Sequence, residues 1–132
     1  MRAVLAIGSN YGFRQANVSK ALEWLGSHSK VIRTSGIYES PDCYGGGKKY
    51  MNSIVEIETG QEEEQLNLLF KEYEIQSGRD ETRRKRGEVP VDIDIVMWGP
   101  EIRRMSDYNA QYFKKGYAAL RNSEPITQNL LK

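Results

Sequence analysis

Cysteine and histidine are almost absent from this chain of 132 residues, which contains one of each, Cys43 and His28. A single cysteine cannot form a disulfide within the chain, and one cysteine with one histidine cannot build a zinc site of the usual Cys and His ligands. Residues 26–29 have the composition of a loop, so we expect His28 to be a solvent-exposed loop residue.

Long apolar runs are also absent. No segment approaches the ~20 apolar residues that a membrane-spanning helix requires. The apolar stretch at residues 3–7 is too short for the core of a signal peptide, and no cleavage site follows it. We therefore expect a protein that has no membrane partner and is located in the cytoplasm.

Neither sign of charge dominates. Lys and Arg number 19 and Asp and Glu number 18, for a net charge of +1, so the composition gives no reason to expect nucleic-acid binding. Hydrophobic residues make up 39% of the chain and charged residues 28%, as in ordinary globular proteins. We expect one domain that spans residues 1–132, and a monomer.

The periodicity of the apolar residues predicts an α+β fold. Two segments have helical spacing, residues 15–25 and the segment from the capping-box residue Thr59 to Gly78. Residues 79–89 are predicted as a charged loop, and residues 100–132 as a helix or loop packed on the body. The resulting order, β-α-β-β-α-β, is the ferredoxin-like arrangement, an antiparallel sheet with helices on one face. The segments with strand composition are residues 3–7, 31–38, 50–58 and 91–98.

Two aspartates, Asp92 and Asp94, are the most unusual feature of the last predicted strand. Residues two apart in a strand share a face, and their Cα atoms lie roughly 6.5–7 Å apart. Two like charges on one face repel each other, and a hard cation such as Mg²⁺ would relieve the repulsion. A polar, solvent-facing strand surface is the alternative. The residues expected on the opposite face are Val91, Ile93, Ile95 and Met97.

Three neighbouring segments could serve the same chemistry. Residues 79–86 contain five cations among eight residues, which would suit phosphate binding or a solvated loop. Residues 44–49 are glycine-rich but lack the P-loop spacing, so they could form an active-site lid or a plain connection. Tyr50 and Asn52 could stack on and hydrogen-bond a heterocycle, or they could be ordinary strand residues.

Together these motifs resemble the 6-hydroxymethyl-7,8-dihydropterin pyrophosphokinase family. The matching segments follow the order of the family and nearly its spacing from residue 3 to residue 99. They are Ala6-Ile7-Gly8-Ser9-Asn10, Tyr38-Glu39-Ser40-Pro41, Tyr50-Met51-Asn52-Ser53, Glu74-Ile75-Gln76-Ser77-Gly78-Arg79 and Val91-Asp92-Ile93-Asp94-Ile95-Val96-Met97-Trp98-Gly99.

The resemblance implies an enzyme with a ferredoxin-like fold that transfers diphosphate from ATP to the hydroxymethyl group of a reduced pterin, in folate biosynthesis, and releases AMP. It implies two Mg²⁺ ions held by Asp92 and Asp94, and Asp92, Asp94 and Arg79 as the catalytic residues. The partners would be small molecules, ATP and the pterin.

The resemblance also implies two sets of binding residues. Residues 43–49 and 80–89 would correspond to loops that close over the substrates, and the backbone from Ser40 to Tyr44 would complete the pterin pocket. The pterin set comprises Ser40, Pro41, Tyr50, Asn52 and Tyr117, with Tyr50 and Tyr117 stacking on the ring. The nucleotide set comprises Lys71, Glu74, Arg79, Ile95 and Lys115.

The chain departs from the family pattern in the loop before the aspartate strand. Glu81 and Val89 stand where the family has arginines, and Arg86 stands where it has tryptophan. Arg83, Arg84 or Arg86 could supply a replacement cation. Beyond residue 99 the match fades, and the Pro-His pair of the family has no counterpart near Tyr108.

These departures leave two further hypotheses beside the enzyme. One is a slow or non-catalytic relative that still binds a pterin or a nucleotide. The other is an RNA-binding ferredoxin-like module, which would need aromatic RNP-type motifs on the central strands. Such motifs are absent from the sequence.

Overall fold

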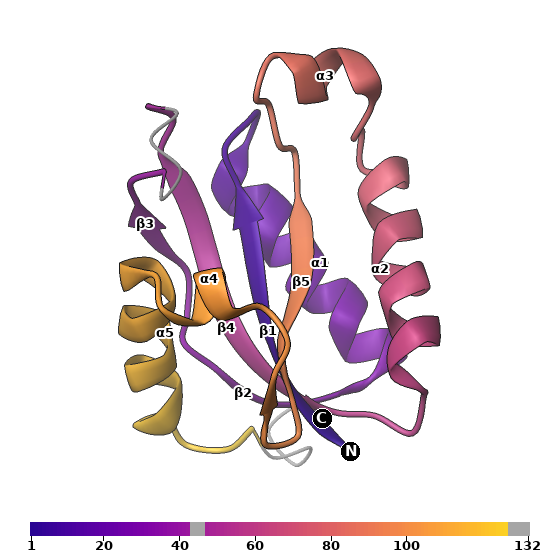
Figure 1. Ribbon diagram of the computed structural model, residues 1–132, viewed down its shortest axis with the longest axis vertical. Helices are drawn as coiled ribbons and strands as arrows, with labels where there is room; N and C mark the ends of the chain where they lie inside the picture. Colours follow the sequence, from indigo (N-terminus) through magenta and orange to yellow (C-terminus); the bar gives the residue numbers. More distant parts are fainter. Residues whose placement is uncertain (43–46, 127–132) are drawn as a thin grey trace.

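The computed structural model describes residues 1–42 and 47–126 and contains one antiparallel sheet flanked by helices (Figure 1). Its strands are β1 (Arg2–Ser9), β2 (Lys30–Thr34), β3 (Tyr38–Ser40), β4 (Tyr50–Glu58), β5 (Asp92–Trp98) and β6 (Glu101–Ile102). Its helices are α1 (Arg14–His28), α2 (Glu63–Gln76), α3 (Glu81–Lys85), α4 (Met105–Tyr108) and α5 (Gln111–Arg121).

The sheet order is β2-β4-β1-β5-β6, and β3 pairs with β4 beside β2. Every pairing is antiparallel. With α1 between β1 and β2, and α2 between β4 and β5, the chain follows the ferredoxin-like β-α-β-β-α-β order, and the predicted α+β class is confirmed. The two strands that carry the sequence motifs, β1 and β5, therefore lie next to each other at the centre of the sheet.

One face of the sheet packs against α1 and α2, which supply apolar residues at helical spacing. Phe70 of α2 has no exposed surface, and burying such a side chain is worth roughly 1.5–3 kcal/mol. Alternate residues of β1 and β4 point to this face. The fully buried side chains here include Leu5, Ile7, Val18, Ala21, Leu25, Val55, Ile57, Leu66 and Ile93.

The opposite face packs against α5, from the segment whose form the sequence left open between helix and loop. Phe113 and Leu120 of α5 meet Ile54 of β4 there. Gly116 permits this close approach, because a Cβ at residue 116 would collide with Tyr38 Oη and Ile54 Cγ1. The expectation of helices on one face thus describes α1 and α2, while α5 adds a third layer.

Several local predictions need correction. Residues 31–38 form two strands instead of one, because Gly36, with φ of 81°, turns the chain between β2 and β3. His28 is the last residue of α1, where it remains exposed and its ring stacks on Trp24 at 4.4 Å between centroids. Thr59 does not cap α2, which begins at Glu63; its Oγ1 accepts a hydrogen bond from the Gln61 N–H instead.

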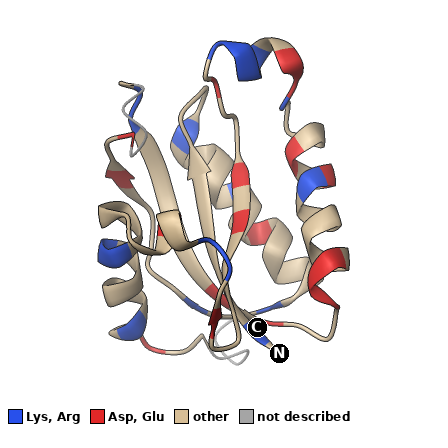
Figure 2. Ribbon diagram, in the orientation of Figure 1, with Lys and Arg blue, Asp and Glu red and all other residues tan. Residues whose placement is uncertain are grey.

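The segment 79–89, predicted as a charged loop, contains the short helix α3 (Figure 2). Asp80 caps it by accepting a hydrogen bond from the Arg83 N–H at 2.8 Å. Within the described residues, no helix is long and apolar enough to cross a membrane.

Candidate active site

Asp92 and Asp94 lie on the β5 face that is not covered by α1 and α2. In the pairing with β1, Asp92 stands opposite Gly8 and Asp94 opposite Ala6. Such small neighbours leave open space beside the two carboxylates instead of packing over them. Acidic residues on β5 are coloured red in Figure 2.

A β-bulge follows the aspartates. Leu5 pairs with Ile95 and Val4 with Met97, so Val96 is the extra residue. The bulge reverses the facing of the strand, and Met97 packs with Val4 against the α5 layer. The prediction that Met97 shares a face with Ile93 and Ile95 is therefore wrong.

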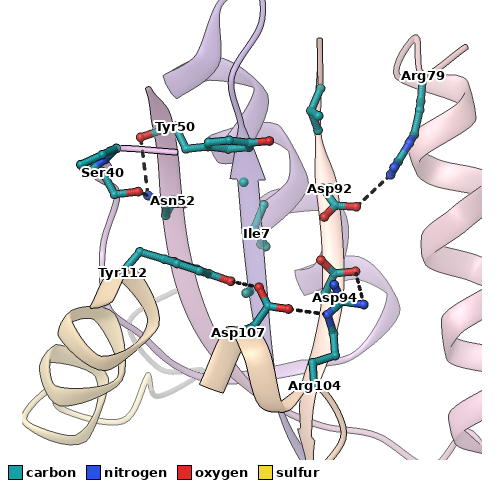
Figure 3. Close-up of a pocket in the computed structure, with 14 residues that line it drawn as sticks. Ile7, Ser40, Tyr50, Asn52, Arg79, Asp92, Asp94, Arg104, Asp107 and Tyr112 are labelled. Carbon is teal, nitrogen blue, oxygen red and sulfur yellow. Dashed lines mark hydrogen bonds and ion pairs between the residues drawn. The ribbon is translucent and has the colours of Figure 1, made fainter. Parts of the chain in front are cut away.

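The open space beside β5 is a cavity of about 210 Å³ (Figure 3). Tyr50, Asn52 and Ser40 form one end, and Asp92, Asp94 and Arg79 form the other. The sequence thus predicted residues at both ends. The lining comprises Ala6, Ile7, Gly8, Ser40, Pro41, Tyr50, Asn52, Arg79, Val89, Asp92, Asp94, Arg104, Asp107 and Tyr112.

The end formed by β3 and β4 combines an aromatic ring with an oriented amide. Asn52 is 3% exposed, and its Nδ2 donates to Ser40 Oγ at 2.6 Å. This bond directs the Asn52 Oδ1 atom toward Gly8, where a Cβ would lie 3.7 Å from it. The Tyr50 ring also lies against Gly8. This end can therefore accept a flat ring and a hydrogen bond from its edge.

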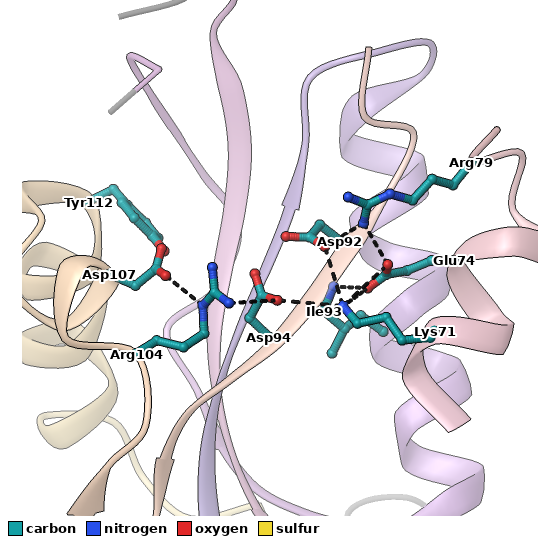
Figure 4. Close-up of polar contacts among 9 residues, drawn as sticks. All are labelled: Lys71, Glu74, Arg79, Asp92, Ile93, Asp94, Arg104, Asp107 and Tyr112. Carbon is teal, nitrogen blue, oxygen red and sulfur yellow. Dashed lines mark hydrogen bonds and ion pairs between the residues drawn. The ribbon is translucent and has the colours of Figure 1, made fainter. Parts of the chain in front are cut away.

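A network of charges from α2 and from Arg79, which follows that helix, lies beside the carboxylate end (Figure 4). Glu74 is 1% exposed and accepts hydrogen bonds from Arg79 Nη1 at 2.6 Å and from the Ile93 N–H at 3.0 Å. Arg79 Nη1 also donates to Asp92 Oδ1 at 2.9 Å. Lys71 Nζ donates to Glu74 Oε2 at 3.1 Å and lies 3.7 Å from Asp94 Oδ1. Glu74 thus orients two cations toward the aspartates.

The two aspartates titrate very differently. Burial, together with the hydrogen bond and charge of Asp92, raises the pKa of Asp94 to about 8. Burial also opposes ionisation of Asp92, but its hydrogen bond with Asp94 and the charges of Lys71 and Arg79 outweigh it and lower the pKa of Asp92. At neutral pH the pair therefore holds one proton between its two carboxyl groups.

A second polar group, which sequence reasoning did not identify, lies across the cavity from Arg79. Arg104 Nε donates to Asp107 Oδ2 at 2.7 Å, and Tyr112 Oη donates to Asp107 Oδ1 at 2.5 Å. Arg104 Nη1 lies 3.9 Å from Asp94 Oδ1. All three residues belong to the segment that follows β6, where neither periodicity nor a known motif marked them.

Three predicted site residues lie elsewhere. Ile95 is buried against α1 and α2 on the far face of the sheet. Tyr117 packs on Phe113, with 5.4 Å between ring centroids, and lines a separate groove on α5. Lys115 Nζ lies 5.7 Å from the centre of the Tyr38 ring. In α5, Phe113, Gly116 and Leu120 face the sheet, and Tyr112 reaches the cavity while Tyr117 does not.

The segment before β5 contributes little to the cavity. Of residues 80–89, only Val89 lines it. Asn10 fixes this segment, because its Oδ1 accepts from the Val89 N–H at 2.6 Å and its Nδ2 donates to Gly87 O at 2.9 Å. Arg83 is turned toward Gly78 O and Asp80 Oδ2. The predicted contribution of Cys43 and Tyr44 to a pocket falls outside the described residues.

Comparison with known sequences decides the family. Residues 4–122 match the sequence model of the family described as 7,8-dihydro-6-hydroxymethylpterin-pyrophosphokinase. The chain belongs to this family. The resemblance drawn from the Gly-Ser-Asn start and the Asp-x-Asp strand is confirmed, and the match extends through α5.

Individual relatives agree with this membership. Over 101 residues the chain is 32% identical to the 2-amino-4-hydroxy-6-hydroxymethyldihydropteridine pyrophosphokinase of Aquifex aeolicus, covering 76% of this chain and 62% of the relative. The Bacillus subtilis protein of the same name is 35% identical over 75% of this chain and 60% of that protein. A folate synthesis bifunctional protein of Arabidopsis thaliana is 30% identical over 73% of this chain and 20% of its own length. The chain therefore spans about three fifths of the two bacterial relatives.

Proposed function

We propose that this protein transfers diphosphate from ATP to the hydroxymethyl group of 6-hydroxymethyl-7,8-dihydropterin, in folate biosynthesis, and releases AMP. The observation that carries the proposal is one cavity with a ring-binding end at Tyr50 and Asn52 and a carboxylate pair at the other end, in a chain of the pyrophosphokinase family. A flat heterocycle and a metal-bound polyphosphate are the ligands that suit these two ends.

The pterin would lie between β4 and α5. Tyr50, from β4, and Tyr112, from α5, both line the cavity, whereas Tyr117 does not (Figure 3). Tyr112 is therefore a better candidate than the predicted Tyr117 to stack on the ring together with Tyr50. The Asn52 Oδ1 atom would accept a hydrogen bond from an N–H of the pyrimidine edge. Ser40 fixes that amide, so the ring would be bound in one orientation.

Asp92 and Asp94 suit Mg²⁺. They are two oxygen donors on one strand face, and their shared proton marks a place where a cation would relieve repulsion. No third Asp, Glu, His or Cys completes a metal-binding cluster among residues 1–42 and 47–126. The remaining ligands would be phosphate and water oxygens, as is usual for Mg²⁺ at nucleotide sites. The family resemblance implies two Mg²⁺ ions at this place. When bound, they would neutralise the negative charge of the phosphate oxygens.

The reaction would be an in-line displacement at the β-phosphorus of ATP. The pterin hydroxymethyl oxygen forms a bond to the β-phosphorus, the bond from that phosphorus to the α,β-bridging oxygen breaks, and AMP leaves with the bond electrons. The hydroxyl proton is released to water. Arg79 and Lys71, oriented by Glu74, would stabilise the negative charge, so catalysis would rest mainly on positioning and charge.

The other expectations concern the setting of the protein. We keep the prediction of a monomer. We keep the prediction of a cytoplasmic location, where ATP is plentiful.

An assay with the purified protein tests the proposal. Protein, Mg²⁺, ATP and the reduced pterin should yield AMP, and omission of the pterin should abolish it. The Asp94→Ala variant is the negative control, and it should lose turnover. Val89, an apolar residue in the cavity, favours one alternative, a relative that binds ligands without turning them over. Tight pterin binding by calorimetry with no AMP above background would select that alternative.

A further inference from the structure

The cavity contains two arginines among its lining residues, and they differ in how fully they are engaged. Arg79 Nη1 already donates to both Glu74 and Asp92. Arg104 enters from the opposite side of β5 (Figure 4). Among the described residues its side-chain hydrogen bonds run from Nε alone, and its Nη1 lies 3.9 Å from Asp94. The outer edge of the Arg104 guanidinium is therefore available to a ligand.

The β-bulge determines where Arg104 lies. The extra residue, Val96, turns its carbonyl to accept the Arg103 N–H at 2.8 Å and the Arg104 N–H at 3.4 Å. The chain that returns from β6 is thereby tied to β5 two residues after Asp94. Arg104 then begins α4 by accepting the Tyr108 N–H at 2.9 Å. The backbone on both sides of Arg104 is thus fixed beside the aspartate pair.

Asp107 holds the guanidinium in place. Its side chain is 5% exposed, and a buried carboxylate is costly unless it is paired. It is paired twice, with Arg104 Nε and with Tyr112 Oη. The charges of Asp94 and Asp107 outweigh the partial burial of Arg104 and keep it cationic. With Nε bonded to Asp107, the two Nη groups make no hydrogen bond among the described residues, and Nη1 lies 3.9 Å from Asp94. Because Arg104 lines the cavity, its guanidinium can offer these groups to phosphate oxygens.

The segment before β5 offers no comparable group. Its residue in the cavity is Val89, which has no charge, and Arg83 is occupied by Gly78 and Asp80. A polyphosphate beside Asp92 and Asp94 would nevertheless need cations on the side opposite Arg79. Arg104 occupies that position.

We propose that Arg104 is a catalytic residue of this chain that binds the ATP phosphates on the side opposite Arg79, and that Asp107 is its positioning residue. This inference rests on the proposed function. In the displacement at the β-phosphorus, the Arg104 Nη groups donate to oxygens of the phosphates on either side of the breaking bond. They stabilise the charge that AMP acquires as it leaves.

The test compares Arg104→Gln with Arg103→Gln. Arg103 is the matched control, because it is the neighbouring arginine, pairs with Glu63 and Glu101, and does not line the cavity. Two quantities are measured with Mg²⁺ present: kcat for AMP formation, and the Kd of the α,β-methylene analogue of ATP by calorimetry. Arg104→Gln should lower kcat by about 10²–10³-fold and raise the Kd of the analogue at least about tenfold. Arg103→Gln should stay within about twofold on both.

Asp107→Asn separates positioning from bulk structure. Alone, it should raise the Kd of the analogue. Combined with Arg104→Gln, it should raise that Kd no further, because the two changes act on one interaction. Arg104→Lys keeps the charge but loses the forked guanidinium, so its kcat should lie between those of Arg104→Gln and the wild type. If thermal melting shows that Arg104→Gln is unfolded, Arg104→Lys takes its place in the comparison.

Wild-type analogue affinity in Arg104→Gln, or in Arg104→Lys where that variant stands in for it, would overturn the inference. The outcome is distinguishable from failure of the proposed function. If Arg104→Gln makes AMP at the wild-type rate while Asp94→Ala does not, the function stands and Arg104 is not catalytic. If wild type makes no AMP, the function fails, and the analogue Kd still decides whether Arg104 binds phosphate.

Discussion

Replacing Asp94 by Asn should stabilise the protein at alkaline pH while it abolishes turnover. The folded chain holds a proton between Asp92 and Asp94, and the pKa of Asp94 is raised to about 8. An asparagine amide has no charge, and its N–H can donate to Asp92 as the protonated carboxyl does. The variant therefore keeps the hydrogen bond and loses the repulsion, and it also loses one of the two proposed Mg²⁺ ligands.

The sign of the pH dependence follows from the raised pKa. In the unfolded chain the pKa of an aspartate is about 3.9. The contribution of Asp94 to stability is fully present below that value and is lost as the pH rises through about 8. Lys71 and Arg104 lie near enough to offset part of the repulsion. We expect Asp94→Asn to gain on the order of 1–3 kcal/mol at alkaline pH, or about 3–10 °C in Tm.

Urea unfolding followed by circular dichroism, between about pH 5 and about pH 9, measures this gain. Glu101→Gln is the control, because Glu101 lies on the adjacent strand β6 with a side chain that is 64% exposed, and it should change little at any pH. The advantage of Asp94→Asn should grow as the pH rises. If the curves of wild type and Asp94→Asn run parallel over the whole range, the two carboxyl groups do not share a proton and the reasoning fails.

Three further predictions concern packing and binding. Gly116→Ala should lose on the order of 2–4 kcal/mol by urea unfolding, because the added methyl collides with Tyr38 and Ile54; a loss under about 0.5 kcal/mol would show that α5 does not pack closely. Tyr112→Ala should weaken pterin binding about 10–100-fold by fluorescence titration, whereas Tyr117→Ala should not; the reverse order would restore Tyr117 as the stacking residue. Asn10→Ala should cost about 1–3 kcal/mol, since it leaves the Val89 N–H without its partner; an unchanged urea midpoint would exclude that role.

The sequence could predict those parts of the molecule that local patterns determine. Strand composition predicted β4 in residues 50–58, and the spacing of Asp92 and Asp94 predicted that they share a face. The helical stripes gave α1 and α2, and the element order gave the topology. These features depend on residues close together in the chain, and the carboxylate end of the cavity follows from them.

What the sequence could not predict depends on pairing register and on packing over long distances in the chain. The bulge at Val96 is a feature of the β1–β5 pairing, and it reversed the facing of Met97. The same bulge anchors the return of the chain to Arg104, so that group was missed as well. Gly116 lets α5 pack closely on the sheet; Tyr112 of this helix lines the cavity, whereas Tyr117, assigned to the site by the family resemblance, lines a separate groove.

The fate of labelled phosphate tests the central proposal most directly. ATP labelled at the γ-phosphorus and ATP labelled at the α-phosphorus are each incubated with Mg²⁺, the reduced pterin and the protein, and the products are separated. Diphosphate transfer predicts that the γ label moves to the pterin and the α label stays in AMP, in equal amounts. Label in free phosphate with ADP as the nucleotide product, or no pterin-bound label at all, would contradict the account.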